Sequence, residues 1–176
     1  MIKTLKILAA LAVLLLLFFL FFPISVKIEK TVSAVEIALD DIALSVPVTV
    51  SIAGTYSWRL FGADTFRGDI SFDSYTQTID NKLEQTDRIP ALTQLDGGDH
   101  LDYGEWLNSQ LFGYISWKPF FGSFVVQVYR PQGQGMGWNT VDGHCIVSLA
   151  TDRDEALKIL KHFSNEHLPP YEYWIS

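Results

Sequence analysis

Apolar residues form one unbroken run near the amino terminus, from Ile7 to Phe22, and no charged residue lies between Lys6 and Lys27. An α-helix rises about 1.5 Å per residue, so the stretch from Ile7 to Val26 matches a hydrocarbon core of about 30 Å. The pattern predicts a transmembrane helix over residues 7–26, preceded by a short cytoplasmic tail of residues 1–6.

The length of this run also bears on whether the segment is cleaved. Lys3 and Lys6 give the positive start that signal peptides and signal anchors share, but the run exceeds the roughly 7–15 apolar residues of a cleaved signal. Residues 23–26 offer no small-x-small pair, and the small residues at 32–34 lie well past the run. We therefore expect an uncleaved, single-pass signal anchor, with secretion after cleavage as the alternative.

The segment after the run, residues 27–44, has apolar residues at helical spacing. These residues are Val32, Val35, Ala38, Leu39 and Ile42. The spacing predicts a juxtamembrane stalk, either continuing the membrane helix or forming a short amphipathic helix, although residues 27–30 are equally compatible with an extended chain.

From residue 46 the period of the pattern becomes two. Apolar or aromatic residues alternate with polar or small ones as far as Leu60, and the alternation resumes from Phe66 to Phe72 after a turn at residues 62–64. This is the pattern of half-buried strands, and it predicts an antiparallel hairpin. Gly54 and Gly68 interrupt the two strands, and such glycines often mark a bulge or the close approach of another backbone.

The rest of the chain predicts shorter strands and one helix. Aromatic and β-branched residues indicate strands at 111–117, 124–130 and 144–149, with a weaker signal at 91–95, whereas residues 131–137 have the composition of a flexible loop. An amphipathic helix is expected over residues 152–163, with Asp152 and Glu155 as a capping box. The predicted fold class is α+β: a transmembrane helix, then a domain of residues 45–176 in which this helix packs on a small antiparallel sheet.

The net charge of the chain limits the expected binding partners and the expected cellular location. From Thr31 onward the chain carries 9 Lys and Arg against 19 Asp and Glu, a net charge of −10. Nucleic-acid binding calls for clustered basic side chains, so nucleic acid is not an expected partner. The flanking lysines are nearly balanced, and the short tail and acidic body favour a cytoplasmic N-terminus with the domain outside the cell membrane. The lipid bilayer is the expected partner of the segment from Ile7 to Val26. An envelope protein or a wall polymer is a further candidate partner.

Residues 96–102 gather three carboxylates, Asp96, Asp99 and Asp102, around His100. Hard cations such as calcium want several oxygen ligands, but the spacing matches no calcium-binding loop. Because Asp-Gly is a hairpin-turn signal, a turn is favoured over a metal site here. No metal or other cofactor is expected.

Cys145 is the single cysteine, so no intrachain disulfide forms. Its neighbour His144 suggests a nucleophile with a base, but successive side chains of a strand point to opposite faces. A buried structural cysteine is therefore favoured. The sequence contains no recognisable hydrolase, metalloprotease, phosphate-loop or dinucleotide motif.

Aromatic residues crowd the segment from Trp106 to Trp138. Most are expected in the core, but two adjacent phenylalanines, Phe120 and Phe121, cannot both point inward from a regular strand. With Trp117 and Trp138 they are the candidate binding residues, exposed to a bilayer or to a partner.

The sequence therefore favours a non-enzymatic, membrane-anchored, extracytoplasmic binding or interaction module. The alternative is a secreted or anchored hydrolase or thiol enzyme that uses Cys145 or the cluster from Asp96 to Asp102.

Overall fold

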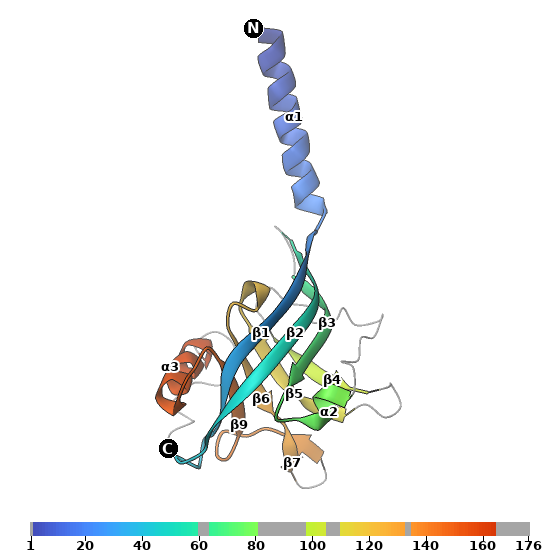
Figure 1. Cartoon of the computed structure of the whole chain (residues 1–176). Coiled ribbons are helices and arrows are strands. Elements are labelled where there is room, and N and C mark those ends of the chain that lie inside the picture. Colours follow the sequence, from blue (N-terminus) through green and yellow to red (C-terminus); the bar gives the residue numbers. More distant parts are fainter. Residues whose placement is uncertain (1, 60–63, 81–97, 105–109, 133–134, 165–176) are drawn as a thin grey trace.

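The computed structural model describes residues 2–59, 64–80, 98–104, 110–132 and 135–164, and Figure 1 shows how their elements are arranged. The first half contains α1 (Ile2–Phe21), β1 (Ile24–Ala38), β2 (Ser45–Trp58), β3 (Thr65–Phe72) and α2 (Thr76–Asp80). The second half contains β4 (Gly98–Tyr103), β5 (Gln110–Trp117), the 3-10 turn η2 (Pro119–Phe121), β6 (Phe124–Val128), β7 (Arg130–Gln132), β8 (Gly135–Gly137), β9 (His144–Ser148) and α3 (Arg153–Ser164).

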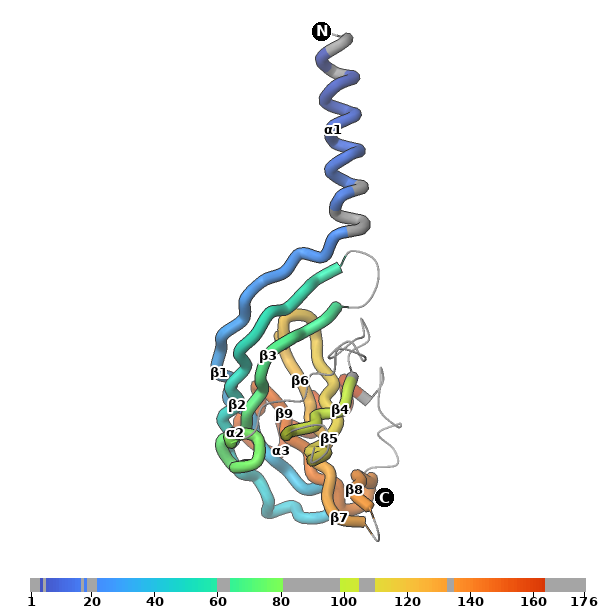
Figure 2. Tube along the Cα trace, turned by 90° about the vertical axis from the view of Figure 1, so that its right-hand side faces the viewer, coloured from blue at the N-terminus to red at the C-terminus, as the bar shows by residue number. Residues whose placement is uncertain are grey.

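Seven of the described strands form one sheet in the order β3-β2-β1-β9-β6-β5-β4, and every neighbouring pair is antiparallel. The longest pairing joins β1 and β2, from Ile24 opposite Trp58 to Ile37 opposite Ser45. β7 and β8 form a separate hairpin. Figure 2 shows the sheet curled, so that the arm of β1, β2 and β3 faces β4 and β5.

The buried residues form two cores, one on each face of the curled sheet. The inner core lies between the two arms and includes Phe66, Phe72, Trp117 and Phe121. The outer core lies where the amphipathic helix α3 covers β1, β6 and β9, and it includes Cys145 and Phe163. Because side chains of a strand alternate between faces, β1 sends Ala34 inward and Val35 outward, and both are buried.

The prediction of a transmembrane signal anchor over residues 7–26 is wrong. Within the described part of the chain, no helix is long and apolar enough to cross a membrane. The apolar stretch that predicted the span is divided between two elements: α1 ends at Phe21, Pro23 follows, and β1 begins at Ile24. Pro23 is compatible with this division because proline lacks the N–H that a continuing helix would donate. α1 also begins before Lys3 and Lys6, so residues 2–6 of the predicted tail belong to the helix.

The predicted α+β fold class is also wrong, because the described chain is mostly β. The main cause is β1, whose residues were expected in a stalk. From residue 34 onward β1 is buried on both faces, so its apolar residues run continuously and the period of two disappears. The hairpin of β2 and β3 is confirmed, and so are strands at β5, β6 and β9. Residues 91–95 lie outside the described residues.

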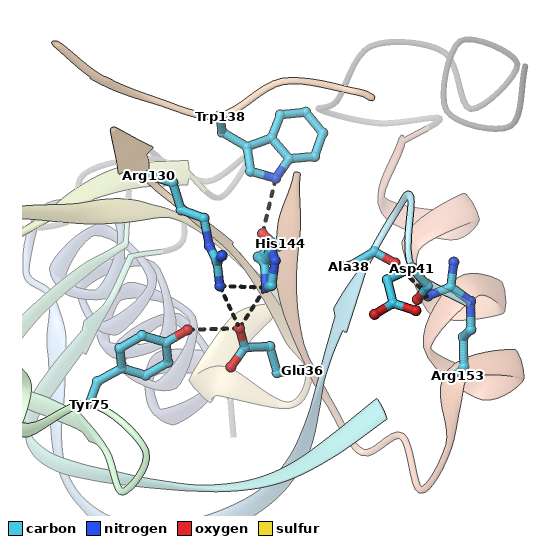
Figure 3. A network of polar contacts seen from close by, with 8 residues as sticks. All are labelled: Glu36, Ala38, Asp41, Tyr75, Arg130, Trp138, His144 and Arg153. Atoms are coloured by element: carbon cyan, nitrogen blue, oxygen red, sulfur yellow. Dashed lines mark hydrogen bonds and ion pairs between the residues drawn. The ribbon is translucent and has the colours of Figure 1, made fainter. Parts of the chain in front are cut away.

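The structure also tests the loop predicted for residues 131–137 and the capping box predicted for α3. The flexible loop predicted for residues 131–137 is wrong for the described residues, which belong to the β7–β8 hairpin. The capping box of α3 is confirmed with a shift of one residue: Asp152 Oδ1 accepts from Glu155 N at 2.9 Å, and Glu155 Oε2 accepts from Thr151 N at 2.9 Å. Arg153 then ties this helix end to the end of β1 by donating to the carbonyl oxygens of Ala38 and Asp41 (Figure 3).

Candidate functional site

The turn η2, which joins β5 to β6, holds its two phenylalanines in an unusual backbone conformation. Phe120 has φ 57° and Phe121 has φ 50°, both in the left-handed region that residues with a side chain rarely occupy. The turn is closed by Lys118 N, which donates to Ser123 O at 2.8 Å. As a result the two rings part: Phe121 is buried, whereas 42% of Phe120 remains exposed.

Each ring has its own aromatic neighbours. Phe121 enters the inner core, where its ring centroid lies 4.9 Å from that of Phe66 and 5.8 Å from that of Trp117. Phe120 lies against Tyr56 of β2, with the centroids 4.5 Å apart. The turn is therefore fixed to β2 and β3, across the curl of the sheet.

A lysine of β1 holds the turn in place. Lys30 Nζ donates to Phe120 O at 2.9 Å and to Phe121 O at 2.5 Å, the carbonyls of the two left-handed residues. Burial lowers the pKa of Lys30. An ammonium group between two carbonyl oxygens offsets part of the cost of this conformation, because hydrogen bonds with a charged donor are the stronger kind.

A buried carboxylate holds the tyrosine under Phe120. Tyr56 donates its hydroxyl to Asp64 Oδ2 at 2.6 Å, and Asp64 Oδ1 accepts from Arg59 N at 3.0 Å. Burial, together with the hydrogen bond to Asp64, raises the pKa of Tyr56, so the hydroxyl keeps its proton and remains a donor.

The structure does not bring the four candidate binding residues together on one surface. Phe120 is exposed, but Trp117 and Phe121 belong to the inner core. Trp138 packs against the outer core, and its Nε1 donates to His144 O at 3.0 Å. Among these four, Phe120 is the one that presents a large apolar surface to its surroundings.

A second cluster lies on the inner face of the sheet near the end of β1, around the buried Glu36 (Figure 3). Glu36 Oε1 accepts from Tyr75 Oη at 2.8 Å and lies 2.8 Å from His144 Nδ1 of β9. Arg130 Nη2 lies 3.8 Å from the same oxygen and 2.9 Å from His144 Nδ1. Burial, and next the charge of Glu36, raise the pKa of Tyr75, which keeps that hydroxyl a donor.

The two contacts of His144 Nδ1 require different states of that atom. A hydrogen bond to the Glu36 carboxylate requires a proton on Nδ1, whereas a hydrogen bond from Arg130 requires a free lone pair there. We assign the proton to Nδ1, because the carboxylate can accept but cannot donate. A carboxylate that accepts from one ring nitrogen in this way orients the other, Nε2, as it does in a histidine general base.

A nucleophile beside this base would complete a catalytic arrangement. In the described ranges of the chain, no serine, threonine or cysteine side chain makes a hydrogen bond to the His144 ring. The described residues therefore contain a paired acid and base without a nucleophile. The other consequence of this arrangement is structural, because it joins β1, β9, β7 and the turn before α2.

The sequence reasoning missed Glu36, Tyr75 and Arg130. One signal was available: Glu36 is the single charged residue among the apolar residues from Val32 to Leu39. A charged side chain inside such a run is buried only with partners, and those partners come from distant segments.

The candidate nucleophile Cys145 lies on the face opposite His144. It belongs to the fully buried outer core, and burial raises the pKa of its thiol to about 12. Nucleophilic cysteines need accessibility and a lowered pKa, and Cys145 has neither.

We therefore expect a thiol reagent at about pH 8 to label Cys145 of the folded chain far more slowly than free cysteine. After denaturation the labelling rate should equal that of free cysteine, which serves as the control for reagent activity. Mass spectrometry over a time course measures both rates. Rapid labelling of the folded chain would contradict the buried position of this thiol.

The described part of the acidic cluster forms a strand. Asp99, His100 and Asp102 lie in β4, whereas Asp96 and Gly97, on which the predicted turn depends, lie outside the described residues. The His100 ring packs edge-on against Tyr114, with the centroids 5.3 Å apart. Over the ranges that the structure describes, no group of three or more His, Cys, Asp or Glu side chains is arranged to hold a metal ion.

Comparisons of the chain with protein-family models, with curated proteins and with solved structures give no match.

Proposed function

We propose that this protein is a non-enzymatic binding module that contacts lipid through α1. The observation that carries the proposal is the surface of α1, which extends away from the sheet in both views (Figures 1 and 2). Its exposed large apolar residues are Ile7, Leu8, Leu11, Val13, Leu14, Leu15, Leu16 and Phe18. Such a surface is unfavourable in water by about 25 cal/mol for each Å².

The distribution of these side chains favours lipid over a protein as the main contact. A helix that docks on a protein carries one apolar stripe and one polar face. The consecutive positions 13–16 of α1 are apolar and exposed, so apolar surface faces all directions around the helix. A single protein groove would cover one side of such a helix, whereas lipid acyl chains can contact any of its sides.

The candidate sites support a binding role more than a catalytic one. The pair of Glu36 and His144 has no nucleophile beside it among the described residues, and the thiol of Cys145 is buried. The position of the sheet domain outside the cytoplasm stays a prediction, as does its contact with an envelope protein or a wall polymer.

Flotation tests the lipid contact of α1. The full chain, purified in detergent, is mixed with phosphatidylcholine, the detergent is removed, and the vesicles are floated through a density gradient. We expect the wild-type chain to float with the vesicles. A chain carrying Leu11→Lys and Leu15→Lys should stay at the bottom, because two charged side chains then lie on the apolar helix.

A matched control places the same two charges elsewhere. Ile42 and Val141 are exposed apolar residues of the sheet domain, with 81% and 75% of their surface accessible. The double variant Ile42→Lys and Val141→Lys should float like the wild-type chain. Failure of the wild-type chain to float, or flotation of the α1 variant, would overturn the proposal.

A further inference from the structure

Four apolar side chains gather at the end of the sheet from which α1 departs. Ile24 and Val26 open β1 and are 40% and 43% exposed. Ile24 lies opposite Trp58 of β2, and Val26 lies opposite Tyr56. Because residues paired across two strands share a face, and because Phe120 lies against Tyr56, these side chains meet on the inner side of the curl. We name Ile24, Val26, Trp58 and Phe120 the apolar rim.

The exposure of Phe120 in this rim is built into the turn. A regular turn has no need for two successive left-handed residues with side chains, and such a conformation persists only where surrounding contacts impose it. Here Lys30 imposes it through both carbonyls, while the core takes up Phe121. These contacts therefore hold the Phe120 ring at the surface.

The rim continues the exposed surface of α1. Phe22, which follows α1 directly, is also exposed and stacks on Phe18, with the ring centroids 4.6 Å apart. Phe22, Ile24 and Val26 thus extend the apolar surface of the helix into the sheet. In Figure 1 the gold turn η2 lies toward the same end of the sheet, and Figure 2 shows the same from the side.

We propose that the apolar rim is a second lipid contact, and that it rests on the surface of the same membrane that α1 contacts. The proposal rests on the lipid contact of α1. The rim would lie at the boundary between the lipid headgroups and the acyl chains. Aromatic side chains are favoured in that layer because it is apolar on one side and hydrated on the other.

An environment-sensitive dye tests this contact. Cys145→Ala provides a background without thiols, and Phe120→Cys or Val26→Cys then carries an NBD label at the rim. Val141→Cys is the control, because residue 141 lies near His144, which pairs with the far end of β1. The labelled full-length chains are compared in detergent-free phosphatidylcholine vesicles and in denaturant.

We expect a label at either rim position to emit at shorter wavelength in vesicles and to be quenched by lipids with a spin label in the upper acyl chain. The label at residue 141 should emit as in water and escape that quenching. If labels at residues 120 and 26 are quenched no more than the label at residue 141, the proposal is overturned. A rim that binds a protein partner instead of lipid would give that result, because the vesicles contain lipid alone.

Flotation of the same preparations separates the two proposals. If the chains float but the rim labels emit as in water, the lipid contact of α1 stands and the lipid contact of the rim is overturned. Chains that do not float overturn both. Two independent rim positions keep the result decisive where the loss of the Phe120 ring disturbs the turn.

Discussion

Replacing Gly68 by alanine is expected to lower the free energy of unfolding by about 3 kcal/mol or more, one of the largest losses available to a single methyl group in this sheet. Gly68 of β3 lies directly opposite Gly54 of β2. A Cβ atom on Gly68 would lie 2.9 Å from the carbonyl carbon of Ala53 and closer still to Ala53 O and Gly54 Cα. These are backbone atoms of a paired strand, so the chains would have to separate to admit the methyl group.

Equilibrium unfolding in denaturant, followed by circular dichroism in one fixed detergent, measures this loss for the full chain. Gly135→Ala is the matched control, because a Cβ on Gly135 of β8 meets no atom within 4 Å. That variant should unfold within about 0.5 kcal/mol of the wild-type chain. Equal stability of the two alanine variants would show that the arm of β2 and β3 does not have the close approach described.

The glycine pair illustrates what the sequence could predict. Alternating residues identify β2 and β3 because one face of each strand is more polar, and glycines within such strands signal a close approach of backbones. β1 gives no such signal, since its second half is buried between the inner core and α3. A strand covered on both faces by distant elements resembles a helix or an apolar run until those elements are known.

The sequence could predict the exposed phenylalanine of the candidate site but not the contacts that hold it. The adjacency of Phe120 and Phe121 required one ring to leave the core, and the structure has Phe121 inside and Phe120 outside. The left-handed turn and its contact with Lys30 were not predictable, because Lys30 lies 90 residues away in sequence from Phe120. The same holds for Glu36 and His144, which are separated by 108 residues.

Glu36→Ala is the second substitution for which we expect a large effect. The carboxylate accepts the Tyr75 hydroxyl and contacts His144 Nδ1, and its removal leaves both groups with an unmatched proton in a largely buried place. Each buried group left without a partner costs about 1–3 kcal/mol. For the two groups together we therefore expect the free energy of unfolding to fall by about 2–6 kcal/mol, with Arg130 contributing little because its side chain is 53% exposed.

A matched control lies on the same strand. Glu29 of β1 is exposed, so Glu29→Ala should change stability by no more than about 0.5 kcal/mol. A similar loss for both variants would show that Glu36 acts only through its charge or its strand propensity.

A double-mutant cycle then isolates the pair of Glu36 and Tyr75. Tyr75→Phe alone should cost about 1 kcal/mol, because it removes one hydrogen bond and leaves an acceptor that retains His144. In the Glu36→Ala background the same change should cost almost nothing, or stabilise, since the hydroxyl that it removes no longer has an acceptor. Additive losses would contradict the network. A coupling of about 1 kcal/mol would instead show that β1 is held to the turn before α2 by this contact as well as by the apolar packing around it.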